Sequence, residues 1–186
     1  MTNLATTNSN LENLSEGQLK AIALMEFNNE PYFIIGDNVY QGDEEAAKES
    51  YEPAKGDYES FDDFCSNECD TVDEIDGTDE KDGYIVLTDE EADEMAANYI
   101  KDSLWAFNAS FLSNETGIDQ SVFEAIQANG KYEDNNDAIE SCIDDIDGFI
   151  QAAISADGRG HFMSSYDGHE NEQTVNNTTF YIYRIN

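Results

Sequence analysis

An extreme excess of carboxylates constrains this chain more than any other feature. Its 186 residues carry 42 Asp and Glu against 8 Lys and Arg, which gives a formal net charge of −34. Repulsion between like charges opposes a compact state, and solubility alone needs a net charge of only about 2–8 in a small domain. The chain is nevertheless 39% hydrophobic and 11% aromatic, which is enough to bury a core. We therefore expect a folded protein whose charge serves more than solubility.

The charge favours some partners and excludes others. Nucleic acid and anionic membranes would repel the chain, so we expect neither as a direct partner. Three demands would explain the excess: mimicry of nucleic acid toward a basic protein, binding of many hard cations, or adaptation to very high salt. Salt adaptation predicts evenly spread carboxylates, whereas 22 of the 52 residues from 43 to 94 are Asp or Glu. This concentration favours a basic binding partner.

The N-terminal sequence and the cysteines indicate a cytoplasmic protein. No stretch reaches the roughly 18 consecutive apolar residues of a membrane span, and the first residues lack the pattern of a signal peptide. The three cysteines, Cys65, Cys69 and Cys142, are an odd number in a chain without an export signal. We therefore expect reduced thiols rather than a disulfide framework.

Hydrophobic periodicity predicts an α+β fold with a small, mainly antiparallel sheet packed by two or three helices. The composition is typical of strands over residues 84–88 and 178–185, and of a strand or a hairpin with a turn at residues 36–38 over residues 32–40. Helical spacing of apolar residues predicts helices over residues 16–27 and 136–156, and a helix capped by Asp119 or Ser121 is predicted to run through Ala128. A further helix is predicted to start at a capping box formed by Thr88 and Glu91, and its apolar stripe extends to Phe111.

We expect one domain with an acidic insertion. Residues 1–15 are polar and predict a flexible N-terminus, and residues 16–186 are predicted to form a single α+β domain. The insertion covers about residues 43–82. Its scattered aromatic residues indicate short ordered helices, because aromatics are scarce in segments that never fold. A disordered loop is the alternative.

No metal or other cofactor is expected. Asp-Gly pairs are frequent, but placing Gly77, Gly83 or Gly148 at position 6 of an EF-hand loop leaves position 1 without a suitable ligand. Cys65 and Cys69 form a C-x3-C pair, yet the other candidate zinc ligands are scattered and have no recognised spacing.

Residues 157–170 are the alternative candidate for a functional site. They contain both histidines, and His161 with Asp167 would form an acid/base pair if the two met. No nucleophile motif or phosphate loop accompanies them. The favoured interpretation is a tight glycine turn in which Arg159 is anchored on nearby carboxylates. We therefore predict no catalytic residues and no enzyme.

The C-terminal half resembles a group of uncharacterised bacteriophage proteins. The resemblance rests on the sequences DGRGH at 157–161, SYDG at 165–168 and YIYR at 181–184. The strand and helix around 84–93 and the segment 103–112 look like the same group. The resemblance implies a phage origin but supplies no activity and no catalytic residues. The acidic residues 43–82 lie outside the shared pattern.

Charge and resemblance together predict a phage-encoded, acidic DNA-mimic inhibitor. It would occupy the basic nucleic-acid-binding surface of a host defence nuclease of the restriction or CRISPR type. Duplex DNA carries one charge per roughly 1.7 Å, whereas a helix with an acid at every third residue carries one per roughly 4.5 Å. Several acidic elements, at 43–82, 88–94 and 133–147, must therefore lie side by side. The alternatives are a phage structural, assembly or cation-binding protein, and an enzyme built on residues 157–170.

The predicted partner-binding surface consists of nineteen carboxylates, with specificity expected from the nearby Tyr51, Tyr58 and Phe61. Thirteen of them belong to the insertion: Glu44, Glu45, Asp57, Glu59, Asp62, Asp63, Asp70, Asp73, Glu74, Asp76, Asp79, Glu80 and Asp82. Six more extend the surface: Glu90, Asp93, Glu94, Asp144, Asp145 and Asp147. The expected partner is a basic DNA- or RNA-binding protein of the host, and a homodimer of this chain would lengthen the acidic face.

Overall fold

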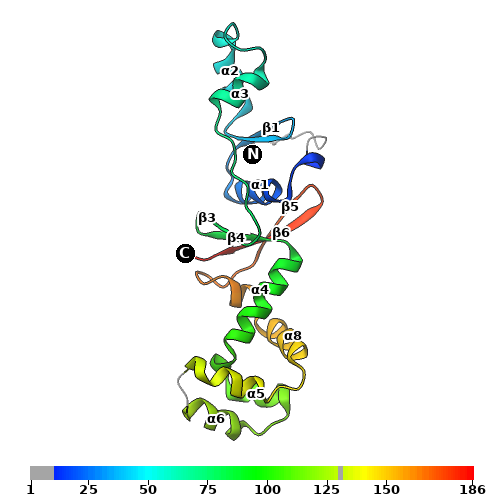
Figure 1. Ribbon diagram of the computed structural model, residues 1–186, viewed down its shortest axis with the longest axis vertical. Helices are drawn as coiled ribbons and strands as arrows, with labels where there is room; N and C mark the ends of the chain where they lie inside the picture. The colour runs from blue at the N-terminus through cyan, green and yellow to red at the C-terminus, as the bar shows by residue number, and fades with distance from the viewer. Residues whose placement is uncertain (1–10, 130–131) are drawn as a thin grey trace. The chain divides into compact units, whose positions relative to one another are not determined.

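The structure, a computed structural model, describes residues 11–129 and 132–186 and confirms the α+β class (Figure 1). The chain divides into two compact units, which are described separately. Unit 1 combines the described part of Met1–Asp89 with Asn171–Ile182, and unit 2 combines Glu90–Glu170 with Tyr183–Asn186. A compact unit is defined by its internal contacts, whereas a domain is defined by its ability to fold independently. The single domain predicted over residues 16–186 therefore stays a prediction.

Unit 1 is built around a four-stranded sheet with the strand order β3-β4-β6-β5. The strands are β3 (Glu80–Lys81), β4 (Tyr84–Leu87), β5 (Asn171–Val175) and β6 (Thr178–Arg184). β3 pairs with β4, and β5 with β6, in antiparallel fashion. Asn176 and Asn177 join β5 to β6 with φ angles of 50° and 61°. Asn tolerates this left-handed conformation, so a two-residue hairpin turn forms there.

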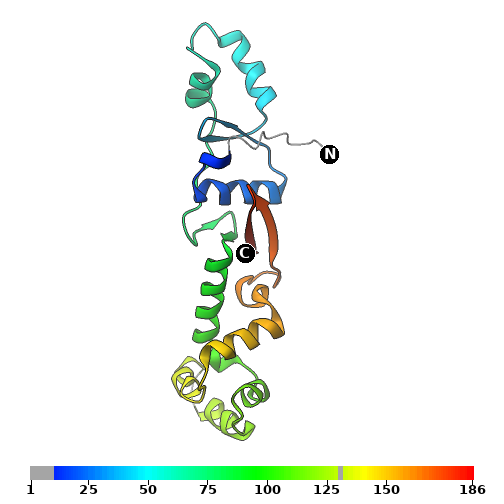
Figure 2. The same ribbon diagram turned by 90° about the vertical axis from the view of Figure 1, so that its right-hand side faces the viewer.

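Helix α1 (Glu16–Asn28) packs on this sheet, beside β5 and β4 (Figures 1 and 2). Its start is fixed by Ser15, whose side chain accepts from Gln18 N, while the Gln18 side chain accepts from Ser15 N. Ile22, Phe180 and other apolar side chains then form the core between helix and sheet. The residues before α1 contribute too, since Leu11 in the 3₁₀ helix η1 (Leu11–Asn13) is buried there.

A second, two-stranded sheet corrects the prediction that residues 32–40 join the main sheet. β1 (Tyr32–Ile35) and β2 (Asn38–Gln41) pair only with each other as an antiparallel hairpin. The other edge of β2 is occupied by residues 70–72: Gln41 N donates to Asp70 O, and Val72 N donates to Val39 O. Long-range pairing with the returning insertion therefore takes the place of pairing with the main sheet.

The acidic insertion is ordered, as predicted. It forms α2 (Glu44–Ala54) and α3 (Phe61–Glu68), which pack against each other (Figure 1). Each helix has a side-chain cap: Asp43 accepts from Glu45 N and Ala46 N, and Ser60 accepts from Asp63 N. Such caps satisfy first-turn amides that have no partner inside the helix.

Unit 2 is helical. Its elements are α4 (Asp89–Asp102), η2 (Leu104–Ala106), α5 (Ala109–Thr116), α6 (Gln120–Asn129), η3 (Tyr132–Asn135), α7 (Asn136–Glu140), α8 (Ile146–Asp157) and α9 (Arg159–Met163). The largest fully buried side chains of this unit include Ile100, Leu104, Leu112, Phe123 and Ile139. Helices α4 and α6 start within a residue or two of their predicted positions.

Two predicted helices in unit 2 are shorter than their apolar stripes suggest. The stripe from Ala92 to Phe111 runs through α4, η2 and α5, and Tyr99 within it is 53% exposed. The predicted helix over 136–156 is broken into α7 and α8. The break has a local cause, because the Asp145 side chain accepts from Gly148 N and caps α8. Capping therefore overrides a periodicity that continues through the turn.

Candidate partner-binding surface

The acidic segment, defined as residues 43–82, is held together by a small aromatic cluster. Phe64 is buried at its centre, with ring centroids 5.5 Å from Tyr51, 5.2 Å from Tyr58 and 6.3 Å from Phe61. Phe33 of the hairpin belongs to the same cluster. Tyr51, Tyr58 and Phe61 are half-buried in these contacts. These three side chains thus form the scaffold beneath the carboxylates. The sequence had predicted a role in specificity for them, but not this structural role.

The end of the acidic segment is anchored to α1. Ile75 N donates to Gly17 O over 3.1 Å, and the fully buried Lys20 donates through Nζ to Gly77 O over 2.8 Å. A Cβ at Gly17 would lie only 3.0–3.1 Å from atoms of Glu74 and Ile75. Glycine at this position therefore permits the close approach, and the segment leaves and rejoins unit 1 at defined points.

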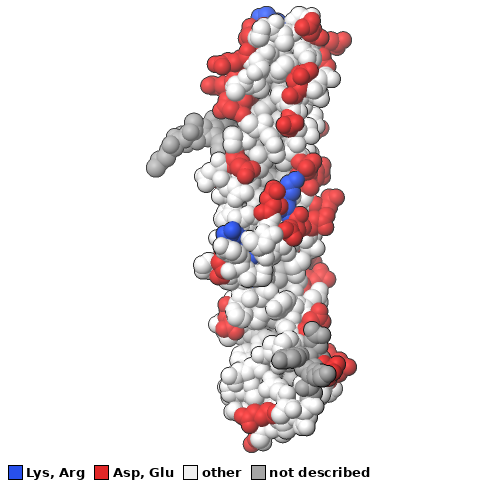
Figure 3. Space-filling model, turned by 90° about the vertical axis from the view of Figure 1, so that its left-hand side faces the viewer, with Lys and Arg blue, Asp and Glu red and all other residues white. Residues whose placement is uncertain are grey.

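The predicted carboxylates lie on the surface. Eighteen of the nineteen are exposed, and Asp63 is half-buried. The thirteen of the acidic segment belong to unit 1, and the six others belong to unit 2. Figure 3 shows Asp and Glu side chains over one face, including the part formed by α2 and α3, with few Lys or Arg beside them. That all three acidic elements share one face stays a prediction.

The acidic segment contains far too few cations to neutralise it. It has 17 Asp and Glu against three Lys, so its carboxylates outnumber its cations by 14. Each lysine is already engaged: Lys48 with Glu44 at 2.6 Å, Lys55 with Glu52 at 2.8 Å and Lys81 with Asp73 at 3.1 Å. These pairs are solvent-exposed and weak, and a basic partner would compete with them readily.

Several predicted surface residues also have a local structural role that sequence reasoning missed. Asp63 accepts from Glu59 N over 3.0 Å, and Glu74 accepts from the Ser15 hydroxyl over 2.8 Å. In unit 2, Asp145 caps α8 and Asp93 forms an ion pair with Arg159. Spacing could have revealed the cap, but the contacts of Glu74 and Asp93 join residues far apart in the chain. These four carboxylates are therefore poor choices for testing partner binding.

The cysteines of the acidic segment, Cys65 and Cys69, are free thiols. Burial, together with a hydrogen bond to Cys69, raises the pKa of the Cys65 thiol to about 12. A thiol in this state stays protonated at neutral pH, so it is neither a nucleophile nor a ready metal ligand. Within residues 11–129 and 132–186, no group of three or more His, Cys, Asp or Glu side chains is arranged to hold a metal ion.

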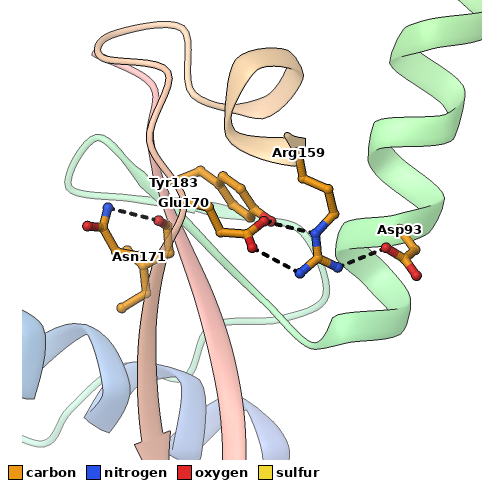
Figure 4. A network of polar contacts seen from close by, with 6 residues as sticks. Asp93, Arg159, Glu170, Asn171 and Tyr183 are labelled. Atoms are coloured by element: carbon orange, nitrogen blue, oxygen red, sulfur yellow. Dashed lines mark hydrogen bonds and ion pairs between the residues drawn. The ribbon is translucent and has the colours of Figure 1, made fainter. Parts of the chain in front are cut away.

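The segment 157–170 is organised by Arg159, as the turn interpretation predicted (Figure 4). The guanidinium donates through Nε and Nη2 to the two carboxylate oxygens of Glu170, over 2.8 and 3.2 Å, and through Nη1 to Asp93 over 2.8 Å. The buried Tyr183 hydroxyl donates to Glu170 over 2.6 Å. The network joins α4, α9 and the last strand within unit 2.

The acid/base pair proposed for His161 and Asp167 is not formed. The His161 ring is exposed and lies edge-on to Phe162, with 5.0 Å between ring centroids. Asp167 instead accepts from His169 N and from the Ser164 hydroxyl, and these bonds lower the pKa of its carboxyl. The carboxylate therefore shapes the turn, and residues 157–170 have the contacts of a structural element.

No helix in the described ranges is both long and apolar enough to cross a membrane. Comparison with protein-family models, with curated protein sequences and with solved structures finds no match to this chain.

Proposed function

We propose that the protein is a binding inhibitor that places its acidic surface where nucleic acid would bind on a basic protein of the host. The class of partner that fits best is a DNA-binding nuclease of a defence system, of the restriction or CRISPR type. The phage origin implied by the sequence resemblance is part of the same proposal. Inhibition by occupancy needs no catalytic group.

The observation that carries the proposal is the surplus of exposed charge on an ordered scaffold. The carboxylates of the acidic segment outnumber its lysines by 14. At roughly 1.7 Å of duplex axis per charge, 14 charges correspond to about 24 Å of DNA. The helix caps and the aromatic cluster fix the spacing of these carboxylates. Binding therefore does not have to pay the entropic cost of ordering the segment. A disordered acidic tail would lack this advantage.

Competition with DNA tests the proposal directly. Purified protein is titrated into a restriction nuclease and, separately, into a guide-loaded CRISPR nuclease, each holding a fluorescent DNA duplex. We expect displacement of the duplex and loss of cleavage. The apparent affinity should fall at least about tenfold between roughly 0.1 and 0.3 M NaCl, because charge pairing drives association.

A block variant identifies the surface. Glu45, Asp57, Glu59, Asp62 and Asp70 are changed to the matching amides, a choice that spares the caps and ion pairs described above. We expect this variant to lose displacement while keeping its circular dichroism spectrum.

The matched control removes the same charge at Glu12, Glu30, Asp102, Glu115 and Asp157, which are exposed and lie outside the three acidic elements. Equal weakening by both variants would show that net charge alone matters. No displacement from either nuclease class would favour the structural or assembly role.

A further inference from the structure

Unit 2 contains an apolar groove whose lining includes none of the nineteen carboxylates. It has a volume of about 630 Å³ and is formed by α6, the end of η3 and α7. Its lining residues are Ser121, Val122, Ala125, Ile126, Asn129, Asn135 and Ala138. Val122 is 41% exposed, which makes it one of the few large apolar side chains that face solvent in the described chain.

The lining follows helical geometry. Val122, Ala125, Ile126 and Asn129 have the spacing i, i+3, i+4, i+7 and so lie along one stripe of α6. The core contact of the same helix is made elsewhere, by the fully buried Phe123. The stripe is therefore a second, more open face of α6, on which Val122 and Ala125 are exposed and Ile126 is half-buried. It spans two helical turns, or roughly 11 Å.

The two walls of the groove are fixed to the same short element. Gln127 of α6 donates through Nε2 to Trp105 O over 3.2 Å and to Phe107 O over 2.8 Å. Asn136 at the start of α7 accepts from Trp105 N over 3.0 Å and donates to Lys101 O. Both walls are thus tied to the chain around η2, and the fully buried Ile139 holds α7 from below. A groove fixed in this way costs little to organise on binding.

The surroundings of the groove are acidic. Glu124, Asp134 and Asp137 are exposed, and each adjoins a lining residue in the chain. From residue 115 to residue 147 the sequence has ten Asp and Glu and a single Lys. A second copy of this chain would bring an equally acidic rim and be repelled. The charge complementarity points to a basic occupant.

We propose that this groove binds a basic amphipathic helix of a partner protein. The apolar face of that helix would lie on the α6 stripe, and its Lys and Arg side chains would meet the acidic rim. Helices bind grooves in this manner through anchors at i, i+3, i+4 and i+7. The site goes beyond the proposed function, because its lining and its rim residues Glu124, Asp134 and Asp137 include none of the nineteen carboxylates of the predicted surface.

The test uses the full chain and a fluorescein-labelled, 18-residue peptide that places Leu on one helical face and Lys on the other. Polarisation is measured in about 0.3 M NaCl, where long-range attraction to the acidic chain is screened. We expect saturable binding. Changing Ala125 to Lys should weaken it at least about tenfold, because a long charged side chain then fills the stripe.

The control is Ala156→Lys, which makes the same change at an exposed alanine of α8. We expect it to weaken binding less than about threefold. A second variant, Val122→Ser, removes apolar contact without adding charge and should also weaken binding. A Leu/Glu version of the peptide should bind at least about tenfold less well than the Leu/Lys peptide.

Other results would overturn the proposal. Equal weakening by Ala125→Lys and Ala156→Lys would mean that only net charge attracts the peptide. Equal binding of the Leu/Glu peptide would show that the occupant need not be basic. Absence of saturable binding would show that the groove is not a binding site for such a helix. Sedimentation that shows a dimer of the free protein, abolished by Ala125→Lys, would identify a second copy as the occupant instead.

Discussion

Replacing Arg159 by Met should destabilise unit 2 strongly while leaving unit 1 folded. The Arg159 side chain is only 11% exposed, and it joins Asp93 on α4 to Glu170 near the start of β5. Methionine retains much of the aliphatic stem, so the change removes the guanidinium without opening a large cavity. Glu170, itself 26% exposed, then keeps only the Tyr183 hydroxyl of the network.

The magnitude follows from the burial of each carboxylate. Removing one partner of a buried ion pair costs about 3–5 kcal/mol, because the other charge stays buried without compensation. Glu170 is partly hydrated, so the lower end applies, at about 3 kcal/mol. Asp93 is 58% exposed, and a pair at this level of exposure contributes less than about 1 kcal/mol. Asp93→Asn should therefore be mild, with the guanidinium still bound to Glu170.

Trp105 provides the assay. It is the single tryptophan of the chain and belongs to unit 2, so its fluorescence during urea unfolding reports on that unit. We expect the free energy of unfolding to fall by about 3 kcal/mol for Arg159→Met and by less than about 1 kcal/mol for Asp93→Asn. Adding Glu170→Gln to Arg159→Met should restore at least about 1 kcal/mol, because it removes the stranded charge.

The reasoning would be refuted by a loss below about 0.5 kcal/mol for Arg159→Met, the size of an ordinary surface substitution. Equal losses for Arg159→Met and Asp93→Asn would also contradict it. In that case the burial of Glu170 would not be the source of the effect.

Three further predictions concern other sites. Gly160→Ala should cost about 3 kcal/mol or more, since its Cβ would lie 2.5 Å from a backbone oxygen of the 168–170 turn, whereas Gly56→Ala meets no atom within 4 Å and should be near neutral; circular dichroism during urea unfolding, which reports on both units, measures the two variants. Burial raises the pKa of Cys65 to about 12, so mass-spectrometric mapping at pH 8 should find it alkylated at least about a hundredfold more slowly than Cys69; comparable rates would contradict this. The pKa of Asp119 is lowered by hydrogen bonds from the hydroxyl and amide two residues on, so its stabilising contribution is present above the ordinary Asp pKa and is lost as the pH falls through its own lower value; a carboxyl NMR titration at or above the ordinary value would disprove it.

The sequence predicted correctly those helices and strands whose ends are set by nearby residues. The α1 helix, the start of α4 and the strands β4 and β6 lie close to their predicted positions, because caps and periodicity act over a few residues. The predicted continuous helix over 136–156 failed for a related reason. Its apolar stripe continues through the turn, but the Asp145 side chain competes for first-turn amides and starts a new helix there.

Features that depend on distant contacts could not be predicted. Nothing near residues 32–40 indicates that residues 70–72 will occupy the free edge of β2. Residues 32–40 were therefore predicted to join the main sheet rather than to form a second one. Composition predicted the exposed carboxylates well. It gave no means of telling Glu74, which bonds to Ser15 across 59 residues, from its neighbours in the acidic segment. The groove on α6 was missed because Val122, Ala125 and Ile126 read equally well as a core-facing stripe.

The division of the chain between the two units has a consequence for synthesis. Unit 1 takes its strands β5 and β6 from Asn171–Ile182, which follow Asp89 after the whole of Glu90–Glu170. At roughly 5–20 residues per second, the ribosome delivers those strands about 4–16 s after the rest of unit 1. During that interval α1 has no β5 to cover its apolar face, and residues 90–170 are free to fold first. The nascent chain therefore exposes the apolar surface of an incomplete sheet during this interval. Protection by a chaperone would matter most at this stage.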